Sequence, residues 1–258
     1  MSFVIDEQNL PYIDLHMHTN YCDGKDTPEQ MVLSATNKGL KVVGITCHSY
    51  THFEEGCSIT PQNELQFIKE IKRLEDKYAD KIKVLCGIEW DLCTTSSIGE
   101  YDYIIGSMHY YRRDDKYFPV DKSKKDFINS VNTLFDGDYY SAAEEYFENV
   151  SKIVESTNCD IIGHIDLVSK FNEGNNLFDE NNPRYILAYK KAVDNLVKFN
   201  KPFEINTGVI SRGYRLAPYP SKQIYDYIKL KGGRFILSSD SHSKENIAFE
   251  FDKWKELI

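Results

Sequence analysis

Three side chains that can bind a metal alternate with apolar ones near the start of the 258-residue chain: Asp14, His16 and His18. In an extended strand, alternate side chains point to one face, so these three would share a face and Leu15 would take the other. Two histidines two residues apart at the end of a strand can reach the same ion. Because short motifs also match by accident, the pattern taken alone more often marks a solvated strand end.

Further histidines and carboxylates end other apolar segments of the chain, and Asp23 lies in the loop after the first segment. Asp23 would serve there either as a ligand or as a turn residue. Together the sequence offers nine candidate metal ligands: His16, His18, Asp23, His48, Glu89, His109, His164, Asp240 and His242. Nine ligands are too many for one ion and suit two or three ions with a bridging carboxylate. Nitrogen and oxygen donors together favour Zn, Mn or Fe over Ca or Mg.

The segments that carry these residues have the length and composition of strands: 12–17, 42–46, 83–89, 103–108, 160–165, 202–207 and 234–239. Amphipathic patterns between them predict helices, the first between Thr27 and Gly39 and the others at 61–79, 123–135, 139–157, 183–199 and 220–231. Alternating strands and helices predict an α/β fold with parallel strands. At this length we expect a seven-stranded barrel related to the (β/α)₈ type, in which the C-terminal strand ends meet at one mouth.

An open, doubly wound sheet is the alternative architecture, but the glycine-rich fingerprint that usually follows its first strand is missing. The sequence shows no repeat, low-complexity tract or Pro/Ser-rich linker, so we expect one domain over residues 1–258.

The composition excludes several classes of partner. The chain has 31 Lys+Arg against 40 Asp+Glu, a net charge of −9, which argues against a nucleic-acid partner. No apolar run approaches a membrane span, and the first residues do not resemble a signal peptide. The six cysteines form no CxxC motif, so we expect reduced thiols in a cytoplasmic enzyme with no membrane partner. The oligomeric state stays open.

The ordered motifs DLHMH, TCH, GIE, GSMH, GHID and SDSH resemble those of the PHP (polymerase and histidinol phosphatase) family, from residue 12 to about residue 242. This resemblance implies a distorted TIM-like (β/α)₇ barrel with three divalent transition-metal ions at the C-terminal ends of the strands. It implies a first ion held by His16, His18, Glu89 and Asp240, a second by Asp23, His48 and His242, and a third by Glu89, His109 and His164. The chain departs from many relatives at Cys47, where they have an acidic residue. We expect Cys47 to point away from the ligands, because neighbours in a strand face opposite ways.

Divalent ions lower the pKa of bound water and neutralise charge on phosphoryl oxygens, which suits phosphate-ester hydrolysis. We therefore predict a metal-dependent phosphomonoesterase in which a metal-bridging hydroxide attacks the ester, with Asp240 and His242 as catalytic residues that could move its proton. Arg212 is the preferred phosphate contact, because EINTG followed by Arg resembles the histidinol-phosphatase branch of the family. Arg112, Arg113 and Arg215 are weaker candidates that also fit ordinary surface charges.

The resemblance favours L-histidinol phosphate, a small phosphorylated substrate, as the ester. A protein-tyrosine phosphatase or a nucleotidase of the same fold is the alternative. A polymerase-associated exonuclease or a structural module fits less well, because the chain is acidic and its ligand set is complete.

Four further residues are candidates for supporting roles. Asp14 and Asp166 could orient ligand histidines, or could be ordinary hydrogen-bonding residues at strand ends. Glu204 and Asn206 alternate along the segment 202–207, so they would face the mouth and meet a cationic part of the substrate, or fill the barrel interior.

Overall fold

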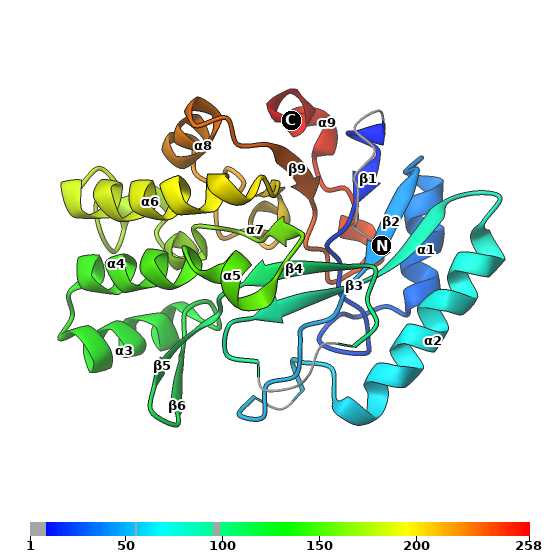
Figure 1. Cartoon of the computed structure of the whole chain (residues 1–258), viewed down its shortest axis with the longest axis horizontal. Helices are drawn as coiled ribbons and strands as arrows, with labels where there is room; N and C mark the ends of the chain where they lie inside the picture. Colours follow the sequence, from blue (N-terminus) through cyan, green and yellow to red (C-terminus); the bar gives the residue numbers. More distant parts are fainter. Residues whose placement is uncertain (1–8, 55, 95–98) are drawn as a thin grey trace.

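The computed structural model describes residues 9–54, 56–94 and 99–258, and within them seven parallel strands form one sheet. The order in the sheet is β1-β2-β3-β4-β7-β8-β9, so each strand pairs with the next one of the sheet along the chain (Figure 1). Their bounds are β1 Ile13–Asp14, β2 Val42–Ile45, β3 Lys83–Asp91, β4 Tyr103–Ser107, β7 Ile161–Ile162, β8 Phe203–Asn206 and β9 Phe235–Ser238.

The two outer strands of this sheet approach each other and nearly close it into a barrel. Met17 and Ser241, which follow β1 and β9, form a parallel bridge. The backbone N–H of His18 donates to the carbonyl of Ser241 at 2.8 Å. The expectation of a seven-stranded barrel is therefore correct, and the open-sheet alternative is wrong.

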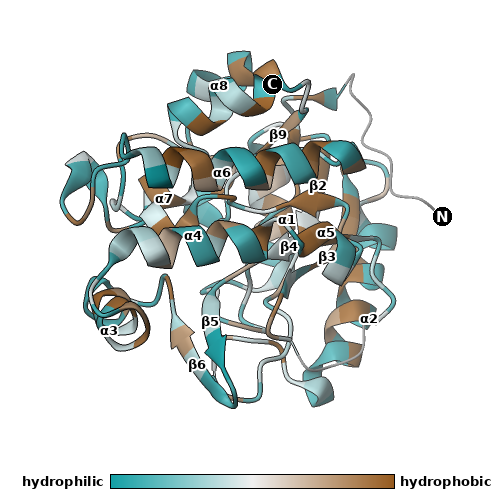
Figure 2. Ribbon diagram, turned by 60° about the vertical axis from the view of Figure 1, so that its left-hand side comes forward, coloured by the Kyte–Doolittle hydropathy of each residue, from teal (hydrophilic) through white to brown (hydrophobic). Residues whose placement is uncertain are grey.

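Helices cover the outside of the sheet, with α1 and α2 beside the first strands and α5 beside the middle strand β4 (Figure 1). Their bounds are α1 Pro28–Asn37, α2 Pro61–Tyr78, α3 Lys124–Phe135, α4 Tyr139–Val150, α5 Ile153–Thr157, α6 Pro183–Leu196, α7 Gly208–Ser211, α8 Lys222–Leu230 and α9 Phe251–Trp254. Figure 2 shows α4 and α6 alternating between hydrophobic and hydrophilic residues along their length. In α6 the buried residues include Tyr185, Ala188 and Tyr189, a spacing of three to four that gives one apolar face.

The first helix begins and ends where the sequence predicts. Thr27 caps its start, because the Thr27 side chain accepts from the backbone N–H of Gln30 while the Gln30 side chain accepts from that of Thr27. Pro28 occupies the first helical position. Gly39 follows the helix with φ +79°, a left-handed conformation that favours glycine.

The structure differs from the predicted elements in several places, and the short helices α7 and α9 were not predicted. The predicted helix 139–157 is two helices, α4 and α5, separated at Ser151 and Lys152. A two-stranded antiparallel hairpin, β5 Tyr110–Arg113 with β6 Lys116–Pro119, follows β4 where no element was predicted. Among the described residues, no helix is both long enough and apolar enough to cross a membrane.

Candidate metal centre

The candidate ligands converge at the C-terminal ends of the parallel strands. His16 and His18 follow β1, Glu89 lies within β3, and His48 after β2 forms a parallel bridge with Glu89. The other strand ends bring in ligands from the second half of the sheet: His109 after β4, His164 after β7, and Asp240 and His242 after β9.

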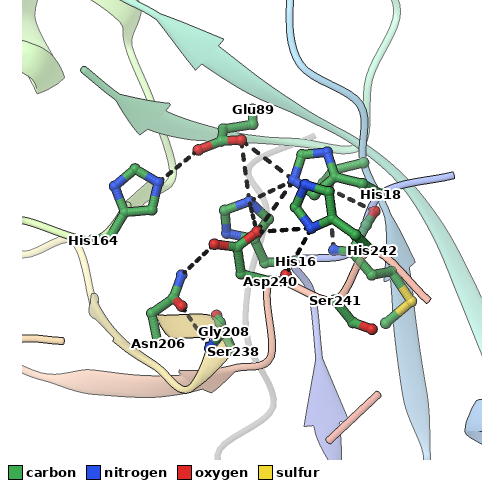
Figure 3. Close-up of polar contacts among 12 residues, drawn as sticks. His16, His18, Glu89, His164, Asn206, Gly208, Ser238, Asp240, Ser241 and His242 are labelled. Atoms are coloured by element: carbon green, nitrogen blue, oxygen red, sulfur yellow. Dashed lines mark hydrogen bonds and ion pairs between the residues drawn. The ribbon is translucent and has the colours of Figure 1, made fainter. Parts of the chain in front are cut away.

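Glu89 is the centre of this arrangement (Figure 3). Its side chain is 1% exposed. Its Oε2 lies 2.9 Å from Nδ1 of His48, 3.3 Å from Nε2 of His16 and 3.4 Å from Nε2 of His18. Its Oε1 lies 2.9 Å from Nε2 of His164 and 3.3 Å from Nε2 of His109. One carboxylate thus faces five imidazole rings, as a bridging ligand between ions would.

Asp240 and Asp23 complete the ligand set. Oδ1 of Asp240 lies 3.5 Å from Nε2 of His18 and 3.8 Å from Nε2 of His16. Oδ2 of Asp23 lies 3.3 Å from Nε2 of His242. Of the two roles the sequence left open for Asp23, the structure places its carboxylate among the candidate ligands.

Gly24 allows the loop that carries Asp23 to pack closely against the end of β1. A Cβ on Gly24 would overlap the carbonyl carbon of His18. The loop between these residues can therefore fold back onto the end of β1 because residue 24 has no side chain.

Three groups of side chains have ligand atoms close enough together to hold an ion. These groups are His18, Asp23, His48 and His242; His16, His18 and Asp240; and His48, Glu89 and His109. Oε2 of Glu89 is buried and makes no hydrogen bond, although it faces three ring nitrogens. A buried carboxylate oxygen without a hydrogen bond among nitrogen donors fits a cation position.

Opposite charges in the centre shift the pKa values of its members. Burial alone would raise the pKa of Glu89, but His16, His48 and His109 hold it well below its usual range. Burial opposes protonation of His109, but Glu89 and Asp91 raise its pKa to about 10. Glu89 is thus ionised, and an ion entering the centre has to displace a proton from His109.

Two buried carboxylates contact histidines among the candidate ligands. Oε1 of Glu204 lies 2.7 Å from Nδ1 of His16, and Oδ2 of Asp91 lies 3.0 Å from Nδ1 of His109. Each of these histidines therefore presents Nε2 to the centre. Glu204 is 1% exposed, so it belongs to the barrel interior and does not meet the substrate. Asp91 was not predicted from the sequence, although it lies two residues after Glu89 and therefore shares its face of β3.

Of the two roles that the sequence left open for Asp14 and Asp166, the structure supports ordinary hydrogen bonding to the backbone. Asp14 accepts from the backbone N–H groups of Ser239 and Ala248 at 3.1 and 3.0 Å. Asp166 accepts from the backbone N–H of Ser221 at 2.9 Å. Both carboxylates accept hydrogen bonds from backbone N–H groups of neighbouring segments, and neither orients the ring of a candidate ligand histidine.

The centre opens into a cavity of about 320 Å³ whose lining includes both Arg212 and Lys170. Nη2 of Arg212 lies 2.8 Å from Oδ2 of Asp240, so the guanidinium is held beside a ligand. Lys170 is 8% exposed, and its Nζ lies 3.0 Å from Oδ2 of Asp121. Lys170 was missed by the sequence analysis, because a lysine in a loop carries no signal of its own.

The weaker arginine candidates and Cys47 lie elsewhere. Arg215 bonds the carbonyl of Ser169, Arg113 pairs with Glu145, and Arg112 stacks on Tyr117, so these arginines do not line the cavity. Cys47 is fully buried in the apolar cluster beneath α1 and α2 and belongs to none of the three candidate ligand groups.

The protein is thus a parallel α/β barrel that gathers six histidines and three carboxylates at the C-terminal ends of its strands, where they could hold metal ions. The model of the PHP domain family matches residues 14–208, and the chain belongs to this family.

Relatives with known names and structures support the same placement. A histidinol-phosphatase from Lactococcus lactis is 26% identical over 95% of this chain and 90% of the relative. A histidinol-phosphatase from Saccharomyces cerevisiae is 22% identical over 74% of this chain and 66% of the relative.

Two crystal structures share the fold. A Listeria monocytogenes protein crystallised as a candidate histidinol phosphatase has a TM-score of 0.81 at 21% identity, covering 94% of this chain and 99% of that protein. Histidinol phosphate phosphatase from Lactococcus lactis, crystallised with zinc, L-histidinol and phosphate, has a TM-score of 0.71 at 20% identity, covering 95% of this chain and 92% of that protein.

Proposed function

We propose that this chain is a metal-dependent phosphomonoesterase that hydrolyses L-histidinol phosphate in histidine biosynthesis. The observation that carries the proposal is the position of Glu89, one buried carboxylate that faces five histidines at the mouth of the barrel. The names of its relatives support the substrate. The proposal also comprises one barrel domain over residues 1–258, a cytoplasmic location, a small phosphorylated substrate as partner, and no nucleic-acid or membrane partner.

The ligand set suits three divalent ions. In the proposal His16, His18, Glu89 and Asp240 hold the first ion, Asp23, His48 and His242 the second, and Glu89, His109 and His164 the third. Zinc is the first metal to test, because a relative was crystallised with it, and the nitrogen and oxygen donors also suit Mn or Fe. Bound divalent ions supply hydroxide at neutral pH and neutralise negative charge on the phosphoryl oxygens.

The chain's own residues would bind the phosphate and orient it. Arg212 and Lys170 both line the cavity, and a guanidinium and an ammonium together suit a phosphate dianion. Because Arg212 is fixed by Asp240, its guanidinium needs little reordering when the phosphate arrives. The cavity also exposes carboxylates, among them Glu54 and Asp121, which suit a substrate that carries an ammonium group.

His242 is the better candidate for moving a proton. Burial and the neighbouring His18 lower the pKa of His242, so its ring is neutral and can accept a proton at neutral pH. Burial would raise the pKa of Asp240, but Arg212 and His16 hold it well below its usual range. In our proposal Asp240 therefore acts mainly as an ionised ligand, and His242 would accept the proton only while its ring is not bound to the second ion.

A phosphatase screen of the purified chain tests this proposal. We expect turnover of L-histidinol phosphate well above that of a phosphotyrosine peptide and of nucleotides, with more than one equivalent of transition metal per chain by elemental analysis. Preference for the phosphotyrosine peptide would indicate a protein-tyrosine phosphatase instead, and preference for nucleotides would indicate a nucleotidase. Full activity in protein shown to be free of metal would refute the mechanism.

A further inference from the structure

Glu204 accepts hydrogen bonds on both of its oxygens from different directions. Oε1 faces Nδ1 of His16 at 2.7 Å. Oε2 accepts from the backbone N–H of His164 at 3.1 Å and from Nδ2 of Asn206 at 3.2 Å. This one carboxylate, within β8, thus connects residues that follow β1 and β7.

The donors that face Oε2 cannot be exchanged for acceptors. A backbone N–H always donates, so His164 requires an acceptor at this point. The amide of Asn206 is equally fixed, because its Oδ1 accepts from the backbone N–H of Gly208 at 3.0 Å (Figure 3). Its Nδ2 group must therefore face Glu204 and Asp240, whose Oδ2 lies 3.3 Å away.

The partner of Oε1 is different, because an imidazole can carry its hydrogen on either ring nitrogen. A carboxylate oxygen at 2.7 Å requires the hydrogen of His16 on Nδ1. The other nitrogen, Nε2, lies 3.3 Å from Glu89 and 3.8 Å from Asp240, the residues proposed to share an ion with it. Nε2 can bind an ion when it carries no hydrogen.

We propose that Glu204 is a positioning residue that fixes the tautomer of His16 and thereby sets the affinity of the first ion position, formed by His16, His18, Glu89 and Asp240. The inference rests on the metal centre of the proposed function. It gives Glu204 a role toward the ion that is separate from any contact with the substrate.

The substitution Glu204→Gln tests the role because a glutamine amide offers one acceptor and one donor. The two fixed donors would keep the amide oxygen on the side of His164 and Asn206. The amide NH₂ would then face Nδ1 of His16, which would have to accept. The hydrogen of His16 would move to Nε2, where Glu89 accepts it, so the variant should fold with His16 in the tautomer that cannot bind an ion.

The experiment is a zinc titration of the parent chain and of E204Q against a chromophoric chelator. We expect E204Q to bind one zinc equivalent about 10–100-fold more weakly than the parent chain does. Its phosphatase activity should be low at limiting zinc and should recover in excess zinc. Glu145→Gln is the matched control, because Glu145 pairs with Arg113 outside the cavity, and it should bind zinc as the parent does.

The outcomes separate this inference from the proposed function. A parent chain that binds no zinc or other transition metal would refute the metal centre itself. A parent that binds zinc and a folded E204Q variant that binds it equally well would refute the role of Glu204 alone. If E204Q does not fold, Glu204→Asp keeps both acceptors but withdraws them from His16. Weaker zinc binding by folded E204D would support the role, and unchanged binding would overturn it.

Discussion

Two hydrogen bonds join His109 to Oδ2 of Asp91. The backbone N–H of His109 donates to this oxygen at 2.7 Å, and Nδ1 of the His109 ring donates to it at 3.0 Å. Asp91 also lies two residues after Glu89 on β3, so one strand supplies the central carboxylate and the carboxylate that orients one of its histidines. The end of β3 therefore determines much of the geometry of the metal centre.

Replacing Glu89 by Gln should remove turnover, because the change neutralises the carboxylate that faces five histidines. We expect kcat to fall by more than about 100-fold, since even residues that contact metal ligands from outside contribute about 10–100-fold. Metal content should fall with it, measured by elemental analysis after dialysis. Circular dichroism should show an intact fold. An E89Q variant that keeps the parent's metal content and activity would contradict the central role of Glu89.

The barrel could be predicted from sequence because its signals are local and repeated. Each strand is a short apolar run, and six of the seven end in a candidate histidine or carboxylate ligand, in a parallel fold where strand ends meet. The break between α4 and α5 could not be predicted in this way. The chain there has neither Pro nor Gly, and the apolar residues Val150, Ile153 and Val154 continue a helical spacing across it.

Alternation along a strand does not predict which carboxylate contacts a candidate ligand histidine. Asp14 and Asp91 each lie two residues from a ligand on the same strand, so the pattern ranks them equally. Asp14 precedes His16 and is buried against the backbone of Ser239, whereas Asp91 follows Glu89 toward the mouth. The register between strands determines whether a carboxylate lies level with the imidazole rings of the neighbouring strands. This register cannot be read from the sequence of one strand alone.

Replacing Arg212 by Ala should weaken phosphate binding in the transition state. The loss of a preorganised donor costs about 10²–10³-fold in rate, so we expect kcat/KM to fall by that factor. Inhibition by inorganic phosphate should weaken as well, which separates phosphate recognition from a general loss of structure. Arg113→Ala is the control, because Arg113 pairs with Glu145 away from the cavity. Equal inhibition of R212A and the parent by phosphate would rule out the assigned contact.

Replacing Gly208 by Ala should disturb the centre through the backbone. A Cβ at this position would lie 2.8 Å from the carbonyl oxygen of Ser239 and 2.9 Å from Cβ of Asp240. Relief of this overlap should cost about 1–3 kcal/mol in the free energy of unfolding and should move Asp240. Urea denaturation and kcat would both report the change. Ser211→Ala in the same short helix is the control, and a G208A variant as stable and active as S211A would disprove the close approach.

Replacing Asp166 by Asn should raise the free energy of unfolding relative to the parent chain, and this gain should grow as the pH rises. Burial raises the pKa of Asp166 to about 6, although Arg215 acts in the opposite direction. The folded chain thus holds this proton more tightly than the unfolded chain does, so ionisation of Asp166 costs stability. This cost is absent below the unfolded pKa near 3.8, grows as the pH rises, and is complete above about pH 6.

Asparagine keeps an acceptor for the backbone N–H of Ser221, and it removes the charge from an Oδ1 that is buried without a hydrogen bond. Between about pH 5 and pH 8, the stability difference between D166N and the parent should therefore grow by about 1 kcal/mol. Chelator-treated samples should be unfolded in urea at both pH values, so that metal binding does not add its own pH dependence. A difference that stays constant or shrinks as the pH rises would mean that Asp166 is ionised in the folded chain at no cost.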